Sequence, residues 1–245
     1  MSKDTYLTVR EYQSREEAVG VVIKLIAIIA SVYGMCRSCQ NLMAFTYFTN
    51  LSNIFMDMVL FGFMVRGIRK IRHGGKAAPV SNGWYVIKFM ATISITLTFF
   101  VYLTILAPTN PNGFVGAYLI NGGGSLCVHV INPLLSILDF ILFDYHYESG
   151  KHHVFYALVP PLVYLLSIVL LASQGMRWGD NMYAPYNFIN FGAPTGWFGF
   201  DLSLMGNTTL GIGVAYMIAL LLIIFAFIGT IFLAIKNLRK KHKAF

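Results

Sequence analysis

The sequence predicts an all-α, polytopic membrane protein with six transmembrane helices in one bundle, and three observations lead to this fold class. Hydrophobic residues make up 57% of the 245 residues, and only 11% are Asp, Glu, Lys or Arg, against about a quarter in soluble globular chains. The mean hydropathy is +0.65. The apolar residues form about six long segments spread from end to end, which argues against a soluble enzyme, a disordered chain or a protein with one signal segment.

Each apolar segment is long enough to cross about 30 Å of hydrocarbon, because an α-helix rises about 1.5 Å per residue. The predicted helices cover residues 18–36, 43–65, 85–107, 124–144, 154–173 and 211–235. The first two are joined by so short a loop, Arg37 to Leu42, that they form a hairpin. No soluble domain or internal repeat is visible, so residues 1–245 are expected to form one membrane domain.

The longest polar segment, residues 174–210, is rich in Gly, Asn, Pro and aromatic residues. It is too apolar to extend freely into water, so we expect it to fold back as a cap on the mouth of the bundle. The loop 108–123, with its Pro, Asn and Gly residues, should lie beside it. Trp178, Tyr186 and Asn187 are the residues of this cap that we expect to cover a substrate.

Basic residues predict the orientation of the bundle. The net charge is +8, but the charges lie in tails and short loops and not on a nucleic-acid-binding face, so no nucleic-acid partner is expected. One side carries only Arg37 and Arg177. The other side carries Lys3, Arg10, Arg15, Arg66, Arg69, Lys70, Arg72, Lys76, Lys151, Lys236, Arg239, Lys240, Lys241 and Lys243. This asymmetry predicts a multi-pass protein of the cell membrane with both termini in the cytoplasm.

Two of the predicted helices carry polar residues along one face. Polar groups are costly in hydrocarbon, so the two faces should meet each other or an internal cavity. Both helices run from outside to inside, which places Thr49 and His129 at similar depth in the outer half of the bundle. The first face is Thr46, Thr49, Asn53 and Asp57, and the second is Ser125, His129, Asn132, Ser136 and Asp139.

The inner half of the bundle is predicted to hold a buried charge layer. Lys24 and Lys88 enter from the inner side and reach the depth of Asp57 and Asp139. These four residues could form a structural ion-pair cluster, or the lysines could extend to the inner interface. A third interpretation is a pathway for protons or ions, which would make the protein a small-solute or proton-coupled transporter or channel.

The outer half admits two interpretations. In the first, the hydroxyls bond to their own helices and His129 forms an ordinary hydrogen bond between helices. In the second, a threonine hydroxyl, Thr49 or Thr46, is a nucleophile with His129 as its base, because a threonine is nearly unreactive without one. The supporting groups, which could stabilise an oxyanion, are Asn53, Asn132 and Ser125.

A metal or another cofactor is not expected from the sequence. His146, His152 and His153 lie in a polar loop, but no paired spacing among them matches a known metal site. Cys36 and Cys39 could pair or remain as two thiols. Hydrolysis by a hydroxyl nucleophile and a histidine needs no cofactor.

Three segments together resemble a known family. Residues 45–53, FTYFTNLSN, resemble the second-helix signature of bacterial Pr6Pr-type membrane proteins. Residues 129–133, HVINP, continuing to Asp139 and Phe140, are similar to the histidine–proline–acid segment of that family. Residues 184–190, APYNFIN, resemble its aromatic motif before the last helix. These proteins are similar in layout to the androgen-induced and androgen-dependent TFPI-regulating (FAR-17a-like) proteins of animals, and the resemblance covers most of the six-helix core.

The resemblance implies a lipid hydrolase. The animal members are described as intramembrane threonine hydrolases that cleave fatty acid esters of hydroxy fatty acids. By this resemblance Thr49 is the nucleophile, because Tyr47 and Phe48 precede it as an aromatic and an apolar residue precede theirs. Thr46, one helical turn away, is the alternative nucleophile, and His129 matches the histidine of the family.

The expected function is therefore an intramembrane esterase that acts on a membrane lipid or another fatty acyl ester. Acyl transfer to another lipid stays open, because the same acyl-enzyme could react with an alcohol instead of water. A transporter or channel is the first alternative, and a non-enzymatic membrane binding protein is the second. The sequence does not distinguish Thr46 from Thr49, and it does not determine the oligomeric state.

Overall fold

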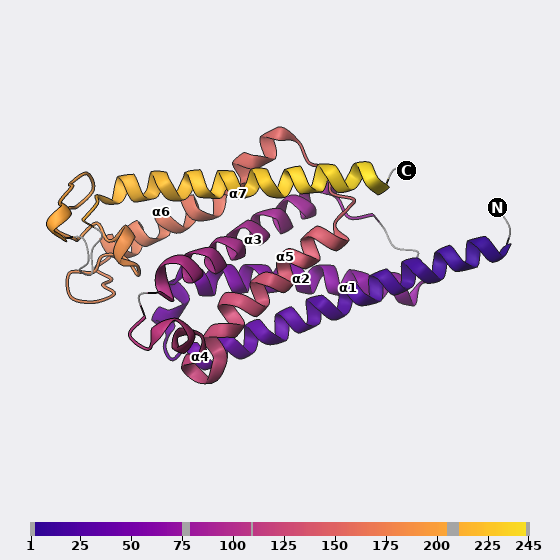
Figure 1. Cartoon of the computed structure of the whole chain (residues 1–245), viewed down its shortest axis with the longest axis horizontal. Coiled ribbons are helices and arrows are strands. Elements are labelled where there is room, and N and C mark those ends of the chain that lie inside the picture. The colour runs from indigo at the N-terminus through magenta and orange to yellow at the C-terminus, as the bar shows by residue number, and fades with distance from the viewer. Residues whose placement is uncertain (1–2, 75–78, 109, 205–210, 244–245) are drawn as a thin grey trace.

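A computed structural model describes residues 3–74, 79–108, 110–204 and 211–243 (Figure 1). Lys76 and residues 205–210 of the predicted cap lie outside the described residues. Regular structure in the described chain is helical, apart from two isolated β-bridges, Gly179 with Met182 and Phe200 with Ile212. The 6 helices that are long and apolar enough to span a membrane are Ser14–Ser38, Phe48–Arg72, Asn82–Leu106, Gly113–Phe143, Lys151–Ser173 and Val214–Leu238. The predicted fold class is thus confirmed.

Several spans contain more than one helical element. The α-helices are α1 (Lys3–Ser38), α2 (Phe48–Arg72), α3 (Asn82–Val101), α4 (Gly113–Leu126), α5 (Asn132–Phe143), α6 (Val159–Ser173) and α7 (Val214–Lys243). The shorter turns are η1 (Leu42–Thr46), η2 (Tyr102–Leu106), η3 (Cys127–Ile131), η4 (Lys151–Leu158), η5 (Asn187–Ile189) and η6 (Leu202–Leu204). Two of them, η2 and η3, are π-helical, and the rest are 3-10 turns.

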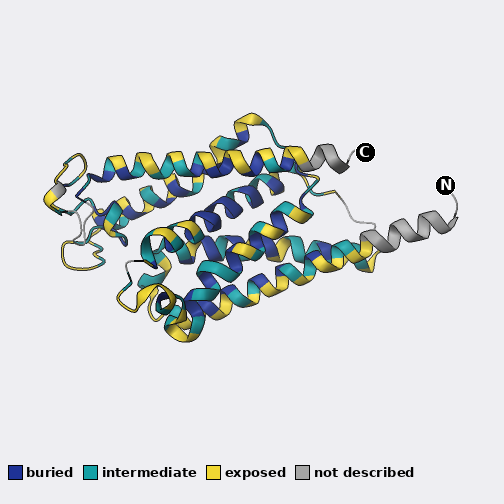
Figure 2. Ribbon diagram, viewed as in Figure 1, coloured by how far each residue is buried: buried dark blue, intermediate teal, exposed yellow. Residues whose placement is uncertain are grey.

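The bundle has two distinct ends (Figure 1). The start of α1 and the end of α7 lie at what we call the terminal end, along with the end of α2 and the start of α3. The segment between α6 and α7 lies at the opposite end, which we call the cap end. Helix α3 runs through the middle of the bundle. Its span is therefore 56% buried, whereas the span that contains α6 is 22% buried (Figure 2).

An aromatic cluster packs around α3 and holds it against its neighbours. Phe89 and Phe140 are fully buried, with ring centroids 6.1 Å apart, and Phe225 of α7 belongs to the same core. The outward faces carry large apolar side chains, such as Leu166 and Phe227, which are 62% and 65% exposed. Such exposure is typical of a surface that contacts lipid instead of water.

Helix α2 begins later than the sequence predicts. Its first residue is Phe48, and Thr46 belongs to the separate turn η1, in which Asn41 Oδ1 accepts a hydrogen bond from Ala44 N at 3.1 Å. Tyr47 between them is extended, with φ −80° and ψ 136°. Thr46 therefore does not share a helical face with Thr49 as predicted, because the chain changes direction between them.

Part of the predicted loop 108–123 is helical. Helix α4 begins at Gly113, and its first helical part ends at a sharp reversal from Ile120 to Gly123, where the backbone is not helical. Asn121, Gly122 and Gly123 have positive φ there, of 57°, 64° and 80°. Glycine adopts this region without steric cost, which explains why the chain can turn back at this point and enter the next part of the span.

Candidate functional site

A cavity of about 1040 Å³ lies at the cap end of the bundle. It is surrounded by the first turn of α2, the two π-helical turns, α4, the last residue of α1 and the capping segment before α7. Its polar lining residues include Thr49, Asn50, Tyr102, Ser125, His129, Tyr186 and Asn187. The structure thus brings two of the predicted catalytic residues, Thr49 and His129, to the same cavity, together with two of the predicted cap residues, Tyr186 and Asn187.

Thr49 is positioned by the start of α2 and by the cap. It lies in the first helical turn, where backbone N–H groups have no partner within the helix. Its N–H donates to the hydroxyl of Tyr186 at 3.3 Å, and its Oγ1 lies 3.4 Å from the same hydroxyl. The Thr49 side chain therefore borders the cavity, and Tyr186 of the capping segment contacts both its backbone N–H and its hydroxyl.

Thr46 has a different environment. Its hydroxyl donates to Met43 O at 2.7 Å and accepts from Trp178 Nε1 at 2.7 Å. Thr46 is absent from the cavity lining. Its hydroxyl thus anchors the capping segment to η1, and Trp178, a predicted substrate contact, serves as the other half of this anchor.

A proline explains how His129 is presented. Pro133 lacks an N–H, and its ring displaces the carbonyl of the residue four positions earlier, which is His129. The regular helical pattern of backbone hydrogen bonds is interrupted there by the π turn η3, in which Asn132 N–H donates to Cys127 O. Turns of this kind are frequent at functional sites.

The His129 ring stacks on Tyr102, a residue that the sequence analysis did not identify. The ring centroids are 3.6 Å apart and the planes are inclined by 13°. Tyr102 begins the other π turn, η2, and its hydroxyl donates to Ala117 O at 2.7 Å and lies 2.6 Å from Ser125 Oγ. Its place near the end of the span, at a depth close to that of His129, is the signal that could have identified it.

His129 has no oriented acidic partner. Its Nδ1 is buried and has no hydrogen-bond partner among the described residues. The orientation of the ring therefore comes from the stack on Tyr102. Ser125, a predicted supporting residue, contributes through Tyr102 and also lines the cavity.

Asn53 and Asn132, the other predicted oxyanion donors, face the interior of the bundle. Asn53 Nδ2 donates to Thr49 O at 2.8 Å and to Val128 O at 3.2 Å, and Asn132 Nδ2 donates to Asn53 Oδ1 at 2.8 Å. Both are fully buried and neither lines the cavity. The two predicted polar faces do meet here, but these amides join helices instead of facing a substrate.

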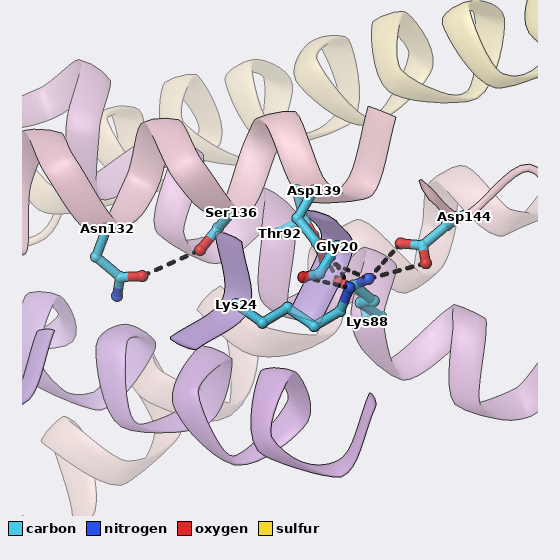
Figure 3. A network of polar contacts seen from close by, with 8 residues as sticks. All are labelled: Gly20, Lys24, Lys88, Thr92, Asn132, Ser136, Asp139 and Asp144. Atoms are coloured by element: carbon cyan, nitrogen blue, oxygen red, sulfur yellow. Dashed lines mark hydrogen bonds and ion pairs between the residues drawn. The ribbon is translucent and has the colours of Figure 1, made fainter. Parts of the chain in front are cut away.

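Further along α5 the side chains of Ser136 and Asp139 lead to a buried charge cluster, which is separate from the amide contacts (Figure 3). Ser136 Oγ donates to Asn132 Oδ1 at 3.1 Å. Lys24 Nζ then lies 2.5 Å from Asp139 Oδ1, and Lys88 Nζ lies 2.6 Å from Asp139 Oδ2. The three charged side chains are at most 8% exposed. Three of the four residues of the predicted charge layer are thus in direct contact.

The fourth member of the cluster is Asp144 and not Asp57. Asp144 Oδ2 lies 2.6 Å from Lys88 Nζ, and the ion pairs of the described residues do not include Asp57. Asp144 directly follows α5 and turns back toward Lys88, whereas both carboxylate oxygens of Asp57 on α2 are buried without a hydrogen-bond partner among the described residues. The sequence predicted that Lys24, Lys88 and Asp139 lie at one level of the bundle, but it did not predict the rotation of α2 about its axis.

A second, apolar cavity adjoins the first. Its volume is about 50 Å³, and Thr49, Tyr186 and Phe188 line both cavities. The walls come mainly from α3, α6 and α7, with Leu97, Val101, Leu106, Tyr164, Leu165, Leu221 and Phe225 among them. Thr49 therefore stands at the boundary between a polar chamber and an apolar one.

The predicted loop histidines and the cysteines lie elsewhere. His153 is buried, with its Nδ1 2.7 Å from the Tyr147 hydroxyl, and within the described chain the His, Cys, Asp and Glu residues form no group of three suited to a metal ion. Cys36 and Cys39 are free thiols, and burial raises the pKa of Cys39.

Comparison with known proteins identifies no relative of this chain. It matches no family model, no curated protein and no solved structure. The chemistry of the cavity itself is therefore the basis on which a function is proposed.

Proposed function

We propose that the protein is an intramembrane hydrolase of fatty acyl esters, with Thr49 as the nucleophile and His129 as the general base. The observation that carries this proposal is that the two side chains line one cavity of about 1040 Å³, at the boundary with an apolar chamber. Cavities that hold small molecules usually measure about 300–1,000 Å³, so there is room for an ester group and its flanking chains.

The environments of the two threonines support Thr49 as the nucleophile. The Thr46 hydroxyl gives its hydrogen to Met43 O and accepts one from Trp178. The Thr49 hydroxyl has only a 3.4 Å contact with Tyr186 and borders the cavity. A nucleophile needs a lone pair that a substrate can reach and a proton that a base can take.

The proposed reaction has two steps. In the first, His129 takes the Thr49 hydroxyl proton while Oγ1 attacks the ester carbonyl carbon; the alkoxide leaves with that proton and an acyl-threonine remains. In the second, His129 takes a proton from water, the hydroxide attacks the acyl carbon, and the proton returns to Thr49 Oγ1. The products are a fatty acid and an alcohol, and the enzyme is regenerated without a cofactor.

Tyr186 is well placed to stabilise the oxyanion. Its hydroxyl accepts from the Thr49 N–H, so its own hydrogen can point to Thr49 or to a carbonyl oxygen beside it. Burial raises the pKa of this phenol, which keeps it protonated and able to donate. A neutral donor aimed at the developing negative charge is the usual design of an oxyanion hole.

The proposed substrate is a lipid that reaches the cavity from the bilayer. The apolar chamber between α3, α6 and α7 would receive part of an acyl chain, and the capping segment would exclude water from the ester. Fatty acid esters of hydroxy fatty acids are the class that the sequence resemblance favours. With the termini in the cytoplasm, as the basic residues predict, entry would be from the outer leaflet.

The experiment that tests this proposal is labelling of the purified protein in detergent with a fluorophosphonate probe, followed by intact-mass measurement. We expect one adduct on the wild type and on Thr49→Ser, and none on Thr49→Ala or His129→Ala. Thr46→Ala is the matched control, since it removes the same hydroxyl three residues earlier in the chain, and it should keep the adduct. The absence of an adduct on folded wild-type protein, or an adduct that persists in Thr49→Ala, would refute the proposal.

The buried charges favour one second candidate, proton-coupled transport. Lys88 and Asp139 are fully buried, and charged groups at this depth often mark ion pathways. Among the described residues, the side-chain hydrogen bonds below the cavity join Asn53, Asn132 and Ser136 and do not reach the cluster, and carboxamides do not carry protons as carboxylates do. We therefore favour the hydrolase. If liposomes with the wild-type protein show proton flux and a folded Asp139→Asn variant does not, proton-coupled transport would replace the hydrolase as the favoured function.

A further inference from the structure

A second large cavity lies at the terminal end of the bundle, on the opposite side of the membrane from the proposed ester site. It is a cleft of about 610 Å³ between the last turns of α2 and the first turn of α3. We call it the α2–α3 cleft. Its lining residues are Val59, Gly62, Phe63, Val65, Arg66, Arg69, His73, Pro79, Val80, Ser81 and Trp84.

The lining of the α2–α3 cleft changes from apolar to basic along its length. Val59, Gly62 and Phe63 line the part nearest the middle of the span, Arg66 and Arg69 follow on later turns of α2, and His73 comes directly after the helix. The fourteen steps along the chain from Val59 to His73 cover about 21 Å, most of the thickness of one leaflet including its headgroups. The cleft is therefore apolar at one end and positive at the other.

Charge complementarity identifies the kind of ligand. Two arginines line the cleft, and the described lining residues include no Asp or Glu. Arg66 also borders a separate pocket of about 60 Å³ that Glu16, Glu17 and Asp144 line with it, and Glu17 forms its ion pair there with Lys70, which does not line the cleft. Arginine presents a planar set of donors that matches phosphate oxygens, and Ser81 adds a hydroxyl at the same end.

Two further features fit an acyl chain beside these charges. Trp84 is 57% exposed in the first turn of α3, and tryptophan is typical of the interface between headgroups and hydrocarbon. Gly62 leaves the apolar wall open, because a Cβ built there would meet nothing within 4 Å. A single chain could lie along α2 at this position.

We propose that the α2–α3 cleft is a binding site for a phospholipid with a net negative headgroup. Arg66 and Arg69 bind the headgroup phosphate, Trp84 lies at the level of the ester groups, and one acyl chain follows Val59 and Gly62. This site is separate from the proposed ester site and does not depend on it. It would fix the position of α2 and α3 relative to the leaflet at the terminal end.

Fluorescence quenching of Trp84 tests the site directly. The variant Trp178→Phe/Trp197→Phe keeps Trp84 as the remaining tryptophan of the three in the chain. It is reconstituted in phosphatidylcholine vesicles with increasing fractions of dibrominated phosphatidylglycerol or, in parallel, dibrominated phosphatidylcholine. We expect the anionic lipid to quench at a several-fold lower fraction. Adding Arg66→Gln and Arg69→Gln should weaken this preference about five-fold for each arginine.

The matched control removes the same charge elsewhere at this end of the molecule. Arg15 and Arg72 are exposed and do not line the cleft, so Arg15→Gln/Arg72→Gln should keep the preference for the anionic lipid. Equal quenching by both lipids would overturn the proposal, as would an equal loss in the two double variants. Displacement of the anionic lipid by excess inorganic phosphate would show a site for a small anion and would also overturn it. Thermal unfolding of each variant confirms that it is folded.

Discussion

At the residue scale, the candidate site separates side chains that look alike in the sequence. Thr46 and Thr49 are three positions apart, but one hydroxyl is occupied by Met43 and Trp178 while the other borders a cavity. His129 also depends on a neighbour that the sequence does not show, because the Tyr102 ring, with its centroid 3.6 Å away, orients the imidazole in place of a carboxylate. The chemistry that each residue can perform depends on the groups that use its hydrogen-bonding capacity.

Replacing Tyr102 should reveal how the histidine is held. Tyr102→Leu removes the stacked ring, and a base displaced by about 1 Å can lose roughly 10²-fold in rate. We expect kcat for ester cleavage to fall by about that factor. Tyr102→Phe keeps the ring and loses only the contacts to Ala117 O and Ser125, so it should retain most of the activity. If the two variants lose activity equally, the hydroxyl and not the ring is what positions His129.

The phenol of Tyr186 leads to a prediction about how the rate of ester cleavage depends on pH. Burial raises its pKa above the usual value of about 10, so the phenol loses its proton only at a pH higher than that. Its contribution to ester cleavage should therefore persist up to about pH 10 and be absent from Tyr186→Phe, with kcat lower by roughly 10²-fold. The check is the pH–rate profile of both proteins. Tyr183→Phe is the control, because Tyr183 does not line the cavity, and it should match the wild type.

At the element scale, the helices are joined by polar contacts that only three-dimensional packing could produce. Asn53 of α2 bonds to Asn132 of α5, and Asp139 of α5 pairs with Lys24 of α1 and Lys88 of α3. Apolar contacts between helices have little specificity in lipid, so these polar contacts determine which faces of the helices meet. The two π turns then aim Tyr102 and His129 at the cavity.

Stability measurements should separate the two aspartates of the predicted charge layer. Asp139→Asn leaves Lys24 and Lys88 without their shared carboxylate, and breaking a buried pair costs about 3–5 kcal/mol. Asp57→Asn is the matched control and should lower the free energy of unfolding far less, since Asp57 has no part in these ion pairs. Denaturant titration in mixed micelles measures both. Equal losses would contradict the charge cluster as the structure has it.

At the scale of the whole molecule, the bundle places the two proposed sites at its two ends. The cavity with Thr49 and His129 lies at the cap end, and the α2–α3 cleft lies at the terminal end. The charge cluster lies between them and holds α1, α3 and α5 together. Ester chemistry in one leaflet and lipid binding in the other would therefore share one rigid core.

The predicted orientation can be tested with thiol labelling in intact cells. Cys36 and Cys39 lie near the cap end, and Ser81 is exposed near the terminal end. If the termini are cytoplasmic, a membrane-impermeant maleimide should label the wild type but not Cys36→Ser/Cys39→Ser/Ser81→Cys until the cells are opened. Cys39 should react more slowly than an exposed thiol, because burial raises its pKa and less thiolate is present. The opposite labelling pattern would invert the topology.

The sequence predicted the six spans correctly because membrane insertion depends on the length and hydropathy of each segment by itself. It also placed Lys24, Lys88 and Asp139 at one depth, since rise per residue is constant along a helix. The places where it was wrong are local. Thr46 leaves the helix at the extended Tyr47, and the predicted loop 108–123 contains α4.

The sequence by itself therefore determined the class of the protein, the number of its spans and the depth of its polar residues. Only the tertiary structure decided that Asp144 and not Asp57 completes the charge cluster, and that Tyr102 stacks on His129. Hydropathy and rise are properties of one helix, so they can be read along the chain. The rotation of a helix about its axis and the opening of its ladder before Pro133 depend on what packs against it, and these decide which side chains meet.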